Sequence, residues 1–312
     1  YKVLPNQGKY FDPVFRDIEA KGKWPNNKVQ HKGHSSDVVT DLTLDWLKNK
    51  RAPNKPFFLM HHFKAPHDMF ENAPRYDNWL ADAEIEAPAS LYDQPYWGSK
   101  STRGENDSLV REIGTSVSKR NPRRNMGIHM GVDQSLNDSE YTYHSYQRYM
   151  KRYLRTVKGV DDNLKRIVDY LRETGEIENT IIIYTSDQGM MLGEHDLIDK
   201  RWMLEESMRM PFIVYHPGKR QAPKASDALI NNTDFAPFIL DLVSVPTPDN
   251  MQGKSFANVL DNKPLEDWRT ATYYRYWMHR AHHDVPGHFG VRTKNHKLIF
   301  YVGAHFDNTP VQ

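Results

Sequence analysis

Short apolar runs bounded by polar or turn-forming residues mark the predicted strands. Each run has four or five residues and is rich in β-branched or aromatic side chains, which is typical of a buried strand. A run with almost no polar residue is typical of a strand buried on both faces of a parallel sheet, and we expect this for the run 180–184 in particular. The predicted buried strands are 57–60, 180–184 and 212–215.

Longer stretches with apolar residues every three or four positions predict helices. The first follows Ser35 or Ser36, either of which can cap it, and carries Val38, Val39 and Leu42 on one face. The second and longest covers 141–173, with Gly175 as its stop signal. A third is predicted over 234–243.

The C-terminal tail has the alternating pattern of antiparallel strands. The predicted strands are 270–277, 289–293 and 297–302, the last two joined by a turn at 294–296. We therefore predict an α/β domain over residues 1–262, followed by a small antiparallel subdomain over 263–312.

A polar segment over about 77–139 interrupts the α/β pattern. It has little periodicity, and residues 99–125 carry seven basic against three acidic side chains. So long a loop is either functional or poorly ordered. We consider two interpretations, a solvated surface loop and a lid that contacts an anionic polymer.

Composition narrows the function classes. The 312 residues carry a net charge of +2, which argues against nucleic-acid binding through bulk charge. They contain no cysteine, which excludes disulfides, zinc–thiolate sites and a thiol nucleophile within this sequence. No apolar run reaches the roughly 20 residues that a membrane-spanning helix needs.

The richest chemistry follows the strand at 180–184. Functional side chains collect just past the carboxyl ends of strands in open α/β sheets. Asp187 offers a hard oxygen ligand and Gln188 a neutral one, while Gly189 allows the chain to turn. With His195 and Lys200 close behind, this stretch predicts a site for a metal ion and an oxyanion. The alternative for Asp187 is a cap on the following turn, which its position after a strand also permits.

These motifs together resemble the second half of a formylglycine-dependent type I sulfatase. The resemblance covers nearly the whole chain, because further segments occur in the order that the family shows. The matching segments are Lys64–His67, Gly159–Asn163, Ser186–Gly189, Leu192–His195, Asp199–Arg201, Glu205–Pro211, Met251–Ser255 and Gly290–Thr293.

The resemblance implies an alkaline-phosphatase-like α/β/α sandwich, incomplete at its N-terminus, that hydrolyses sulfate esters. The family's nucleophile is a formylglycine made from a Cys or Ser, and its precursor motif is not found in these residues. We therefore expect the nucleophile segment to lie upstream of Tyr1 and this chain alone to be inactive. The same resemblance implies a periplasmic, secreted or lysosomal location and leaves the oligomeric state open.

The resemblance also implies roles for individual residues. Asp187 and Gln188 would bind one calcium ion, with Mg²⁺ as the alternative. Lys200 would bind a sulfate oxygen, and His67 would donate a hydrogen bond or proton to the ester oxygen. The substrate contacts that it suggests, each with an ordinary structural role as the alternative, are Lys64, His195 and His288.

We interpret the chain as part of a sulfuric ester hydrolase that acts on a sulfated sugar or polysaccharide. The basic segment and the abundant aromatic residues favour a carbohydrate substrate, since aromatic faces stack on sugar rings. One alternative is a phosphonate monoester or phosphodiester hydrolase of the same superfamily. Another is a noncatalytic relative that binds anionic glycans.

Overall fold

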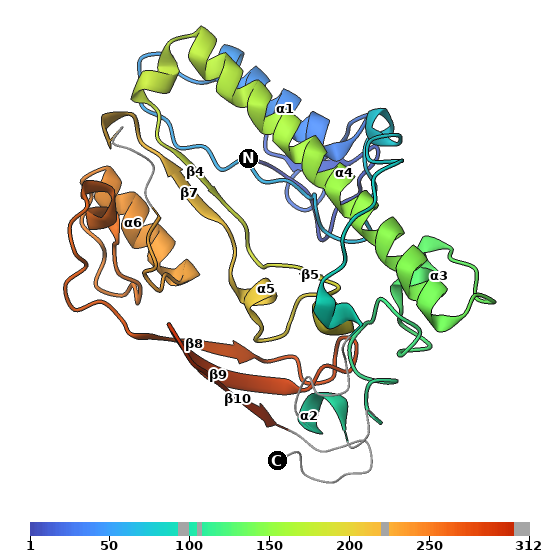
Figure 1. The fold of residues 1–312 in the computed structure, drawn as a ribbon. Helices are drawn as coiled ribbons and strands as arrows, with labels where there is room; N and C mark the ends of the chain where they lie inside the picture. Colours follow the sequence, from blue (N-terminus) through green and yellow to red (C-terminus); the bar gives the residue numbers. More distant parts are fainter. Residues whose placement is uncertain (93–99, 105–107, 220–224, 303–312) are drawn as a thin grey trace. The chain divides into compact units, whose positions relative to one another are not determined.

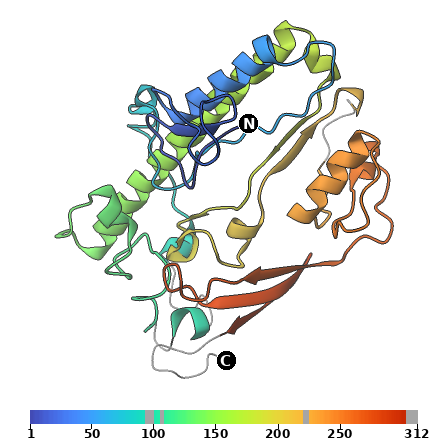
Figure 2. The same ribbon diagram turned by 180° about the vertical axis from the view of Figure 1, so that it is seen from behind.

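The computed structural model describes residues 1–92, 100–104, 108–219 and 225–302, which fall into two compact units. Unit 1 comprises Tyr1–Glu86 and Tyr143–Asn179, and unit 2 comprises Ala87–Thr142 and Thr180–Gln312. Figures 1 and 2 show their elements from two sides. Across the described residues, every helix is too short or too polar to cross a membrane.

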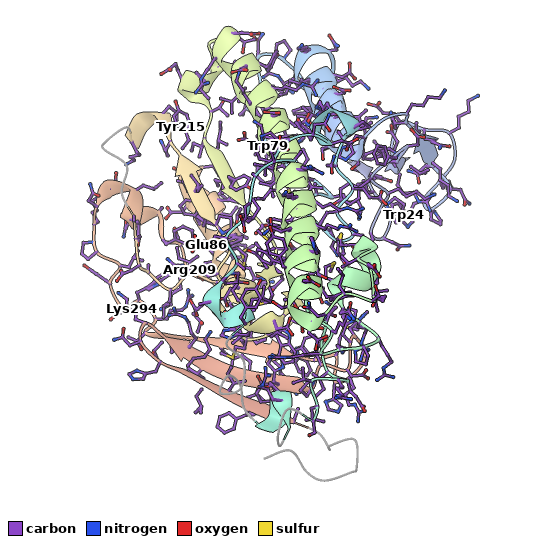
Figure 3. All side chains as sticks on the ribbon, turned by 45° about the vertical axis from the view of Figure 1, so that its right-hand side comes forward. Trp24, Trp79, Glu86, Arg209, Tyr215 and Lys294 are labelled. Atoms are coloured by element: carbon purple, nitrogen blue, oxygen red, sulfur yellow. The ribbon has the colours of Figure 1, made fainter. Side chains whose placement is uncertain are left out.

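Unit 1 combines a small antiparallel sheet with two helices. The sheet has the order β1 (Lys2–Val3), β2 (Val14–Asp17), β3 (Lys28–Gln30). Helix α1 (Ser35–Asp45), which continues into a π-helical turn at Trp46–Lys50, lies beside α4 (Asp138–Glu173), as Figures 1 and 2 show. Trp24 is an exposed ring at the surface of this unit (Figure 3), packed edge-on against Tyr1.

Two predictions for unit 1 need correction. The cap of α1 is His34 and not a serine, because its Nδ1 accepts a hydrogen bond from the backbone N–H of Ser36 at 3.3 Å. The run 57–60 is not a buried strand: Phe58 is 68% exposed, Met60 is 65% exposed, and no described strand pairs with the run. Apolar content predicted burial there, but burial needs a neighbouring element. The prediction of α4 is confirmed to within a few residues.

Unit 2 contains the remaining strands. β4 (Ile182–Thr185) pairs with β7 (Phe212–Tyr215), and the short hairpin of β5 (Met191–Leu192) and β6 (Ile198–Asp199) lies between them in the sequence. A three-stranded antiparallel sheet of order β10-β9-β8 forms the tail, as predicted. Its strands are β8 (Ala271–Tyr276), β9 (Gly287–Thr293) and β10 (Lys297–Val302).

The helices of unit 2 are short. The longest is α6 (Phe235–Leu242), which packs Phe235 and Phe238 against Phe212 of β7 and confirms the predicted third helix. The others are α2 (Lys100–Arg103), α3 (Met126–Met130) and α5 (Glu205–Met208). Short 3₁₀ helices lie in both units, at Pro74–Tyr76, Ala89–Leu91, Glu176–Asn179, Glu194–Asp196, Pro217–Lys219, Asn232–Asp234 and Ala257–Asp261.

The predicted parallel pairing of the strand at 180–184 is wrong. β4 and β7 run antiparallel, with Ile182 opposite Tyr215 and Thr185 opposite Phe212. Ile213 is 60% exposed, so this pair is not fully buried either. Apolar content identified both strands correctly. It did not determine their direction, which depends on the strand that lies alongside.

The polar segment 77–139 is not simply a solvated loop. Residues 113–117 and 125–127 are buried, and asparagine side chains satisfy the backbone nearby. Asn121 accepts from the backbone N–H of Arg124 at 2.9 Å, and Asn125 accepts from that of Ile128 at 3.1 Å. Arg111 and Arg123 remain exposed. The many asparagines led to a prediction of solvent exposure. Their burial depends on backbone partners that exist only in the folded chain.

Candidate functional site

Asp187 and Gln188 lie directly after β4 and are exposed. Neither side chain has a hydrogen-bond or ion-pair partner within the described parts of the chain, so their oxygens remain open to a ligand. The sequence predicted that Gly189 allows a turn, but the structure shows another reason for glycine at this position. A Cβ atom there would lie 1.8 Å from the carbonyl oxygen of Glu206, so only glycine allows the α5 segment to approach.

Lys200 lies directly after β6, beside the Asp199 carboxylate, which Arg201 and the imidazole of His283 also approach. Asp199 has a left-handed φ of 73°, and its side chain is only 11% exposed. The Lys200 Nζ lies 3.5 Å from one Asp199 oxygen, Arg201 forms an ion pair with the other, and His283 Nε2 lies 3.9 Å from it. The ammonium of Lys200 therefore lies in a polar network centred on the Asp199 carboxylate.

Ser207 brings the two segments together. This residue of α5 is completely buried, and its carbonyl accepts a hydrogen bond from Gly189 N at 3.0 Å. Its hydroxyl oxygen accepts one from Arg201 N at 3.1 Å. One buried residue thus connects the neighbour of Gln188 with the neighbour of Lys200.

The β5–β6 hairpin separates His195 from these residues. Met191 pairs with Asp199 at the open end of the hairpin. Gln188, which precedes β5, and Lys200, which follows β6, therefore both lie at this open end. His195 lies in the turn at the closed end, with a left-handed φ of 57°. Its backbone N–H donates to Ser90 Oγ at 3.1 Å. The predicted substrate contact of His195 stays a prediction.

Asp196 is a buried residue of the same turn that sequence reasoning missed. Its carboxylate accepts hydrogen bonds from the backbone N–H groups of Val117 at 3.1 Å and Ser118 at 2.9 Å, and from the Ser118 hydroxyl. Burial raises the pKa of Asp196 to about 6. The residue fixes the hairpin turn to the segment before α3. Donors so far away in the sequence leave no local signal.

His288 is buried within a cluster of aromatic rings, those of Trp202, Tyr274, Tyr276 and Tyr301. Its Nδ1 lies 2.8 Å from the Pro286 carbonyl, which assigns the proton to Nδ1 because a carbonyl only accepts. Nε2 has no hydrogen-bond partner among the described residues, and burial lowers the pKa of the ring. The predicted substrate contact of His288 would require this nitrogen to become accessible.

Lys64 and His67 lie together in unit 1, on one tight turn. The backbone N–H of His67 donates to the Lys64 carbonyl at 3.0 Å. Tyr10 contacts both: the Lys64 ammonium lies 4.7 Å from the centre of its ring, and its hydroxyl donates to the His67 carbonyl. The Asp68 carboxylate lies 2.6 Å from His67 Nδ1 and orients the imidazole.

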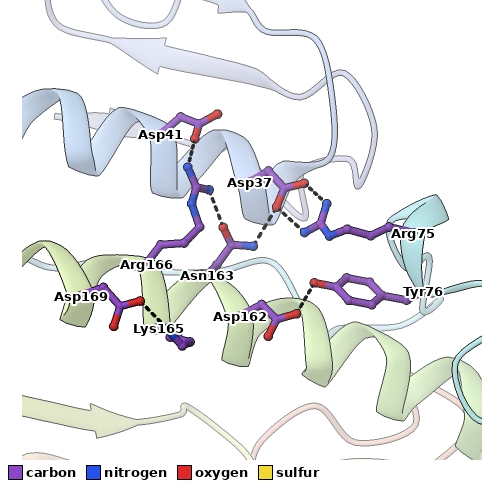
Figure 4. A pocket seen from close by; sticks show the side chains of 9 residues that line it. All are labelled: Asp37, Asp41, Arg75, Tyr76, Asp162, Asn163, Lys165, Arg166 and Asp169. Carbon is purple, nitrogen blue, oxygen red and sulfur yellow. Dashed lines mark hydrogen bonds and ion pairs between the residues drawn. The ribbon is translucent and has the colours of Figure 1, made fainter.

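A polar hollow of about 530 Å³ lies elsewhere in unit 1, between α1, α4 and the turn at Arg75 (Figure 4). Arg75 forms a two-pronged ion pair with Asp37, which also accepts from buried Asn163 at 2.8 Å. Arg166 pairs with Asp41 across the same gap. These side chains neutralise one another and join the two helices. None of the predicted site residues lines this hollow.

The donors at Asp187 and Gln188 fit a hard cation only in part. Ca²⁺ takes about six to eight oxygen ligands, and these two side chains offer fewer. Within the described ranges, no group of three or more His, Asp or Glu side chains is placed to hold an ion. The chemistry of the donors suits calcium or magnesium, and further oxygens would have to complete the shell.

Comparison with protein families gives two matches. The family model described as Sulfatase matches residues 2–245, and the model described as N-sulphoglucosamine sulphohydrolase, C-terminal, matches residues 193–308. The first covers more than half of the chain. The second begins at the β5–β6 hairpin and includes Lys200, Ser207 and the tail sheet.

Individual relatives agree with these matches. The chain is 36% identical to the N-acetylglucosamine-6-O-sulfatase of Bacteroides thetaiotaomicron, over 95% of this chain and 57% of that protein. It is 31% identical to the N-acetylglucosamine-6-sulfatase of Bos taurus, over 88% of this chain and 43% of that protein. It therefore spans about half the length of these two relatives.

Solved structures share the fold. A protein solved in complex with its substrate D-glucosamine-2-N,6-O-disulfate superposes with a TM-score of 0.79 at 35% identity, covering 97% of this chain and 67% of that one. A phosphonate monoester hydrolase from Silicibacter pomeroyi superposes with a TM-score of 0.64 at 20% identity, covering 84% and 51%. The second likeness concerns the fold alone.

Proposed function

This chain belongs to the sulfatase family, and from that membership we propose that the protein containing it hydrolyses a sulfate ester on a glucosamine-type sugar. Two relatives at or above 31% identity are named as N-acetylglucosamine 6-sulfatases, and a similar structure holds a disulfated glucosamine. These names favour a 6-O-sulfated glucosamine unit, alone or in a glycan. The exported location that the resemblance implies is part of the same proposal.

One observation carries the proposal: buried Ser207 joins the Asp187–Gly189 segment to the Lys200–Arg201 segment. Two open oxygen ligands and a fixed ammonium thereby reach the same end of the β5–β6 hairpin. A sulfate ester carries its negative charge on oxygens. An ammonium group, and a metal ion bound by the two oxygen ligands, would neutralise that charge as the bond to the leaving alcohol breaks. Preorganised charge lowers the barrier because it needs no rearrangement during the reaction.

The residues of this chain then have separate roles. Lys200 binds a sulfate oxygen as a compact cation, and the shared carboxylate of Asp199 fixes where its ammonium lies. His67 delivers a proton to the departing alcohol oxygen, with its ring oriented by Asp68. Lys64, on the same turn as His67, contributes a further positive charge toward the substrate.

Two groups complete the proposed chemistry. A calcium or magnesium ion held by Asp187 and Gln188 would neutralise charge on the sulfate, and a formylglycine would supply the nucleophile. The 312 residues contain no cysteine, so we propose that this formylglycine comes from a Cys or Ser in another part of the protein.

The test uses the full-length protein with glucosamine 6-O-sulfate and an aryl phosphodiester as competing substrates. We expect the sulfate ester to have the higher kcat/KM, and Lys200→Ala to lower that kcat/KM by about 100-fold or more, the loss typical of an oxyanion contact. Lys294→Ala, at an exposed ion pair with Asp227, is the matched control and should change little. Preference for the phosphodiester, or an unaffected Lys200→Ala enzyme, would contradict the proposal.

A further inference from the structure

The segment that follows Lys200 lies along the inner face of the tail sheet. Trp202 and Met203 are both buried, at 3% and 0% exposure. Alternate residues of a strand share one face, so His288, Gly290 and Arg292 of β9 point to the same side. Tyr274 of β8 lies opposite Gly290, and Lys297 of β10 lies opposite Arg292, which places both on that face as well.

Contacts between the segment and this face follow the direction of β9. Trp202 stacks on His288, with ring centres 6.2 Å apart and planes 18° from parallel. Met203 comes next and lies over Gly290, where a Cβ atom would be 2.6 Å from the Met203 sulfur. The same Cβ would lie 2.2 Å from the Leu298 carbonyl oxygen, which cannot move aside. A side chain here would therefore clash first with β10, and the flexible end of Met203 packs over the space that the glycine leaves.

Charged groups close the far end of the contact. Arg292 binds Glu205 with two hydrogen bonds, Nε to Oε1 and Nη2 to Oε2, both 2.8 Å long. Lys297 Nζ lies 3.0 Å from the same Oε1. These contacts, with Arg292 the largest cause, lower the pKa of Glu205 to about 2. A two-pronged pair of this kind fixes orientation as well as distance.

A contact at the near end reaches the residue next to the lysine. The Tyr274 hydroxyl donates to the Arg201 carbonyl at 3.3 Å. On its other side, Lys200 follows Asp199, which is paired with Met191 in the hairpin. The backbone of Lys200 is therefore bounded by a strand pair before it and by a docked segment after it.

We infer that the tail sheet is the positioning platform for Lys200, and that Arg292 acts as a positioning residue through the segment 201–205. This inference rests on the role of Lys200 proposed above. The side chain of Arg292 contacts Glu205 and the carbonyl of Thr293. Its effect passes through Glu205 and the segment in between, where a displacement of about 1 Å is enough to cost on the order of 100-fold in rate.

The test compares substitutions of two cations, one on β9 and one in the turn that follows it. Arg292→Gln removes the pair with Glu205, and Lys294→Gln removes an equal charge from the adjoining turn, where it pairs with exposed Asp227. Hydrogen–deuterium exchange of the full-length protein should be about tenfold faster over 201–205 in Arg292→Gln and unchanged in Lys294→Gln. Arg292→Lys should recover part of the protection. If Arg292→Gln does not fold, Glu205→Gln tests the same pair from the other side.

Kinetics on the sulfated sugar supply the second measurement. We expect Arg292→Gln to lower kcat/KM by about tenfold, mostly through kcat, and Lys294→Gln to leave it unchanged. Equal exchange over 201–205 in both variants would overturn the docking. Faster exchange with unchanged kcat/KM would overturn the positioning role. A Lys200→Ala enzyme with normal kcat/KM would instead overturn the proposed function of Lys200, while the exchange result would still decide the docking.

Discussion

Ser207 supports two segments with different parts of one residue, the carbonyl for Gly189 and the hydroxyl for Arg201. Only the second contact depends on the side chain. Substitution by alanine therefore removes the hydroxyl contact and retains the first. The Arg201 N–H would then be left in a protein interior without this acceptor.

We predict that Ser207→Ala lowers the free energy of unfolding by about 1–3 kcal/mol, the cost of a buried donor without a partner. We also expect a loss of several-fold in kcat/KM, since Arg201 adjoins Lys200. Urea unfolding and steady-state kinetics of the full-length protein measure the two effects. Ser226→Ala is the control, because Ser226 is exposed and accepts from Ala228 N at 3.3 Å. Equal behaviour of the two variants would contradict the prediction.

At this scale, sequence reasoning singled out groups with recognisable chemistry, whose roles stay predictions, and missed groups defined by burial. Asp187, Gln188 and Lys200 stand in motifs that can be read directly. Asp196 and Ser207 were missed because their hydrogen-bond donors are mainly backbone N–H groups, which any residue carries. The donors to Asp196 also lie far away in the sequence. A serine in the middle of a helical turn has no pattern that distinguishes it from an exposed one.

Among the elements, Gly189 and Gly175 illustrate two distinct needs for glycine. Gly189 permits close approach, since a Cβ there would lie 1.8 Å from a backbone oxygen of α5. Gly175 follows α4 with a left-handed φ of 72° and has open space where a Cβ would lie. Only the second matches the stop signal that the sequence predicted.

We predict that Gly189→Ala lowers the free energy of unfolding by about 3 kcal/mol or more, because the backbone of α5 would have to move. Gly175→Ala should cost only about 1–2 kcal/mol, the strain of a left-handed alanine. Chemical unfolding of both full-length variants would compare them directly. The opposite ranking would show that α5 does not hold Gly189 as tightly as this close approach requires.

Element predictions succeeded where a local pattern determines the outcome. The limits of β7 were predicted to the residue, and α4, α6 and the tail strands to within a few. The direction of β4 and the burial of 57–60 were wrong, because both depend on which element lies alongside. The boundary proposed at residue 262 stays a prediction.

For the whole molecule, the proposed cation should act on stability as well as on chemistry. An ion that binds only the folded protein stabilises it by about 2.7 kcal/mol at 100 times its Kd. We predict that Ca²⁺ raises the Tm of the full-length protein and that EDTA reverses the shift. Asp187→Asn should abolish the Ca²⁺ dependence, whereas Asp227→Asn, at an exposed ion pair, should retain it. A Ca²⁺-dependent Tm in Asp187→Asn would remove Asp187 from the ion site.

The alternation of β9 also divides the tail sheet into two sides under unequal evolutionary constraint. Its inward residues, His288, Gly290 and Arg292, each meet one part of the segment after Lys200, so exchanges there should be rare. Val291, on the outward side, is 43% exposed, and Leu298 opposite it on β10 is 58% exposed. We expect homologues to vary more on that outer side than on the side that meets the segment after Lys200.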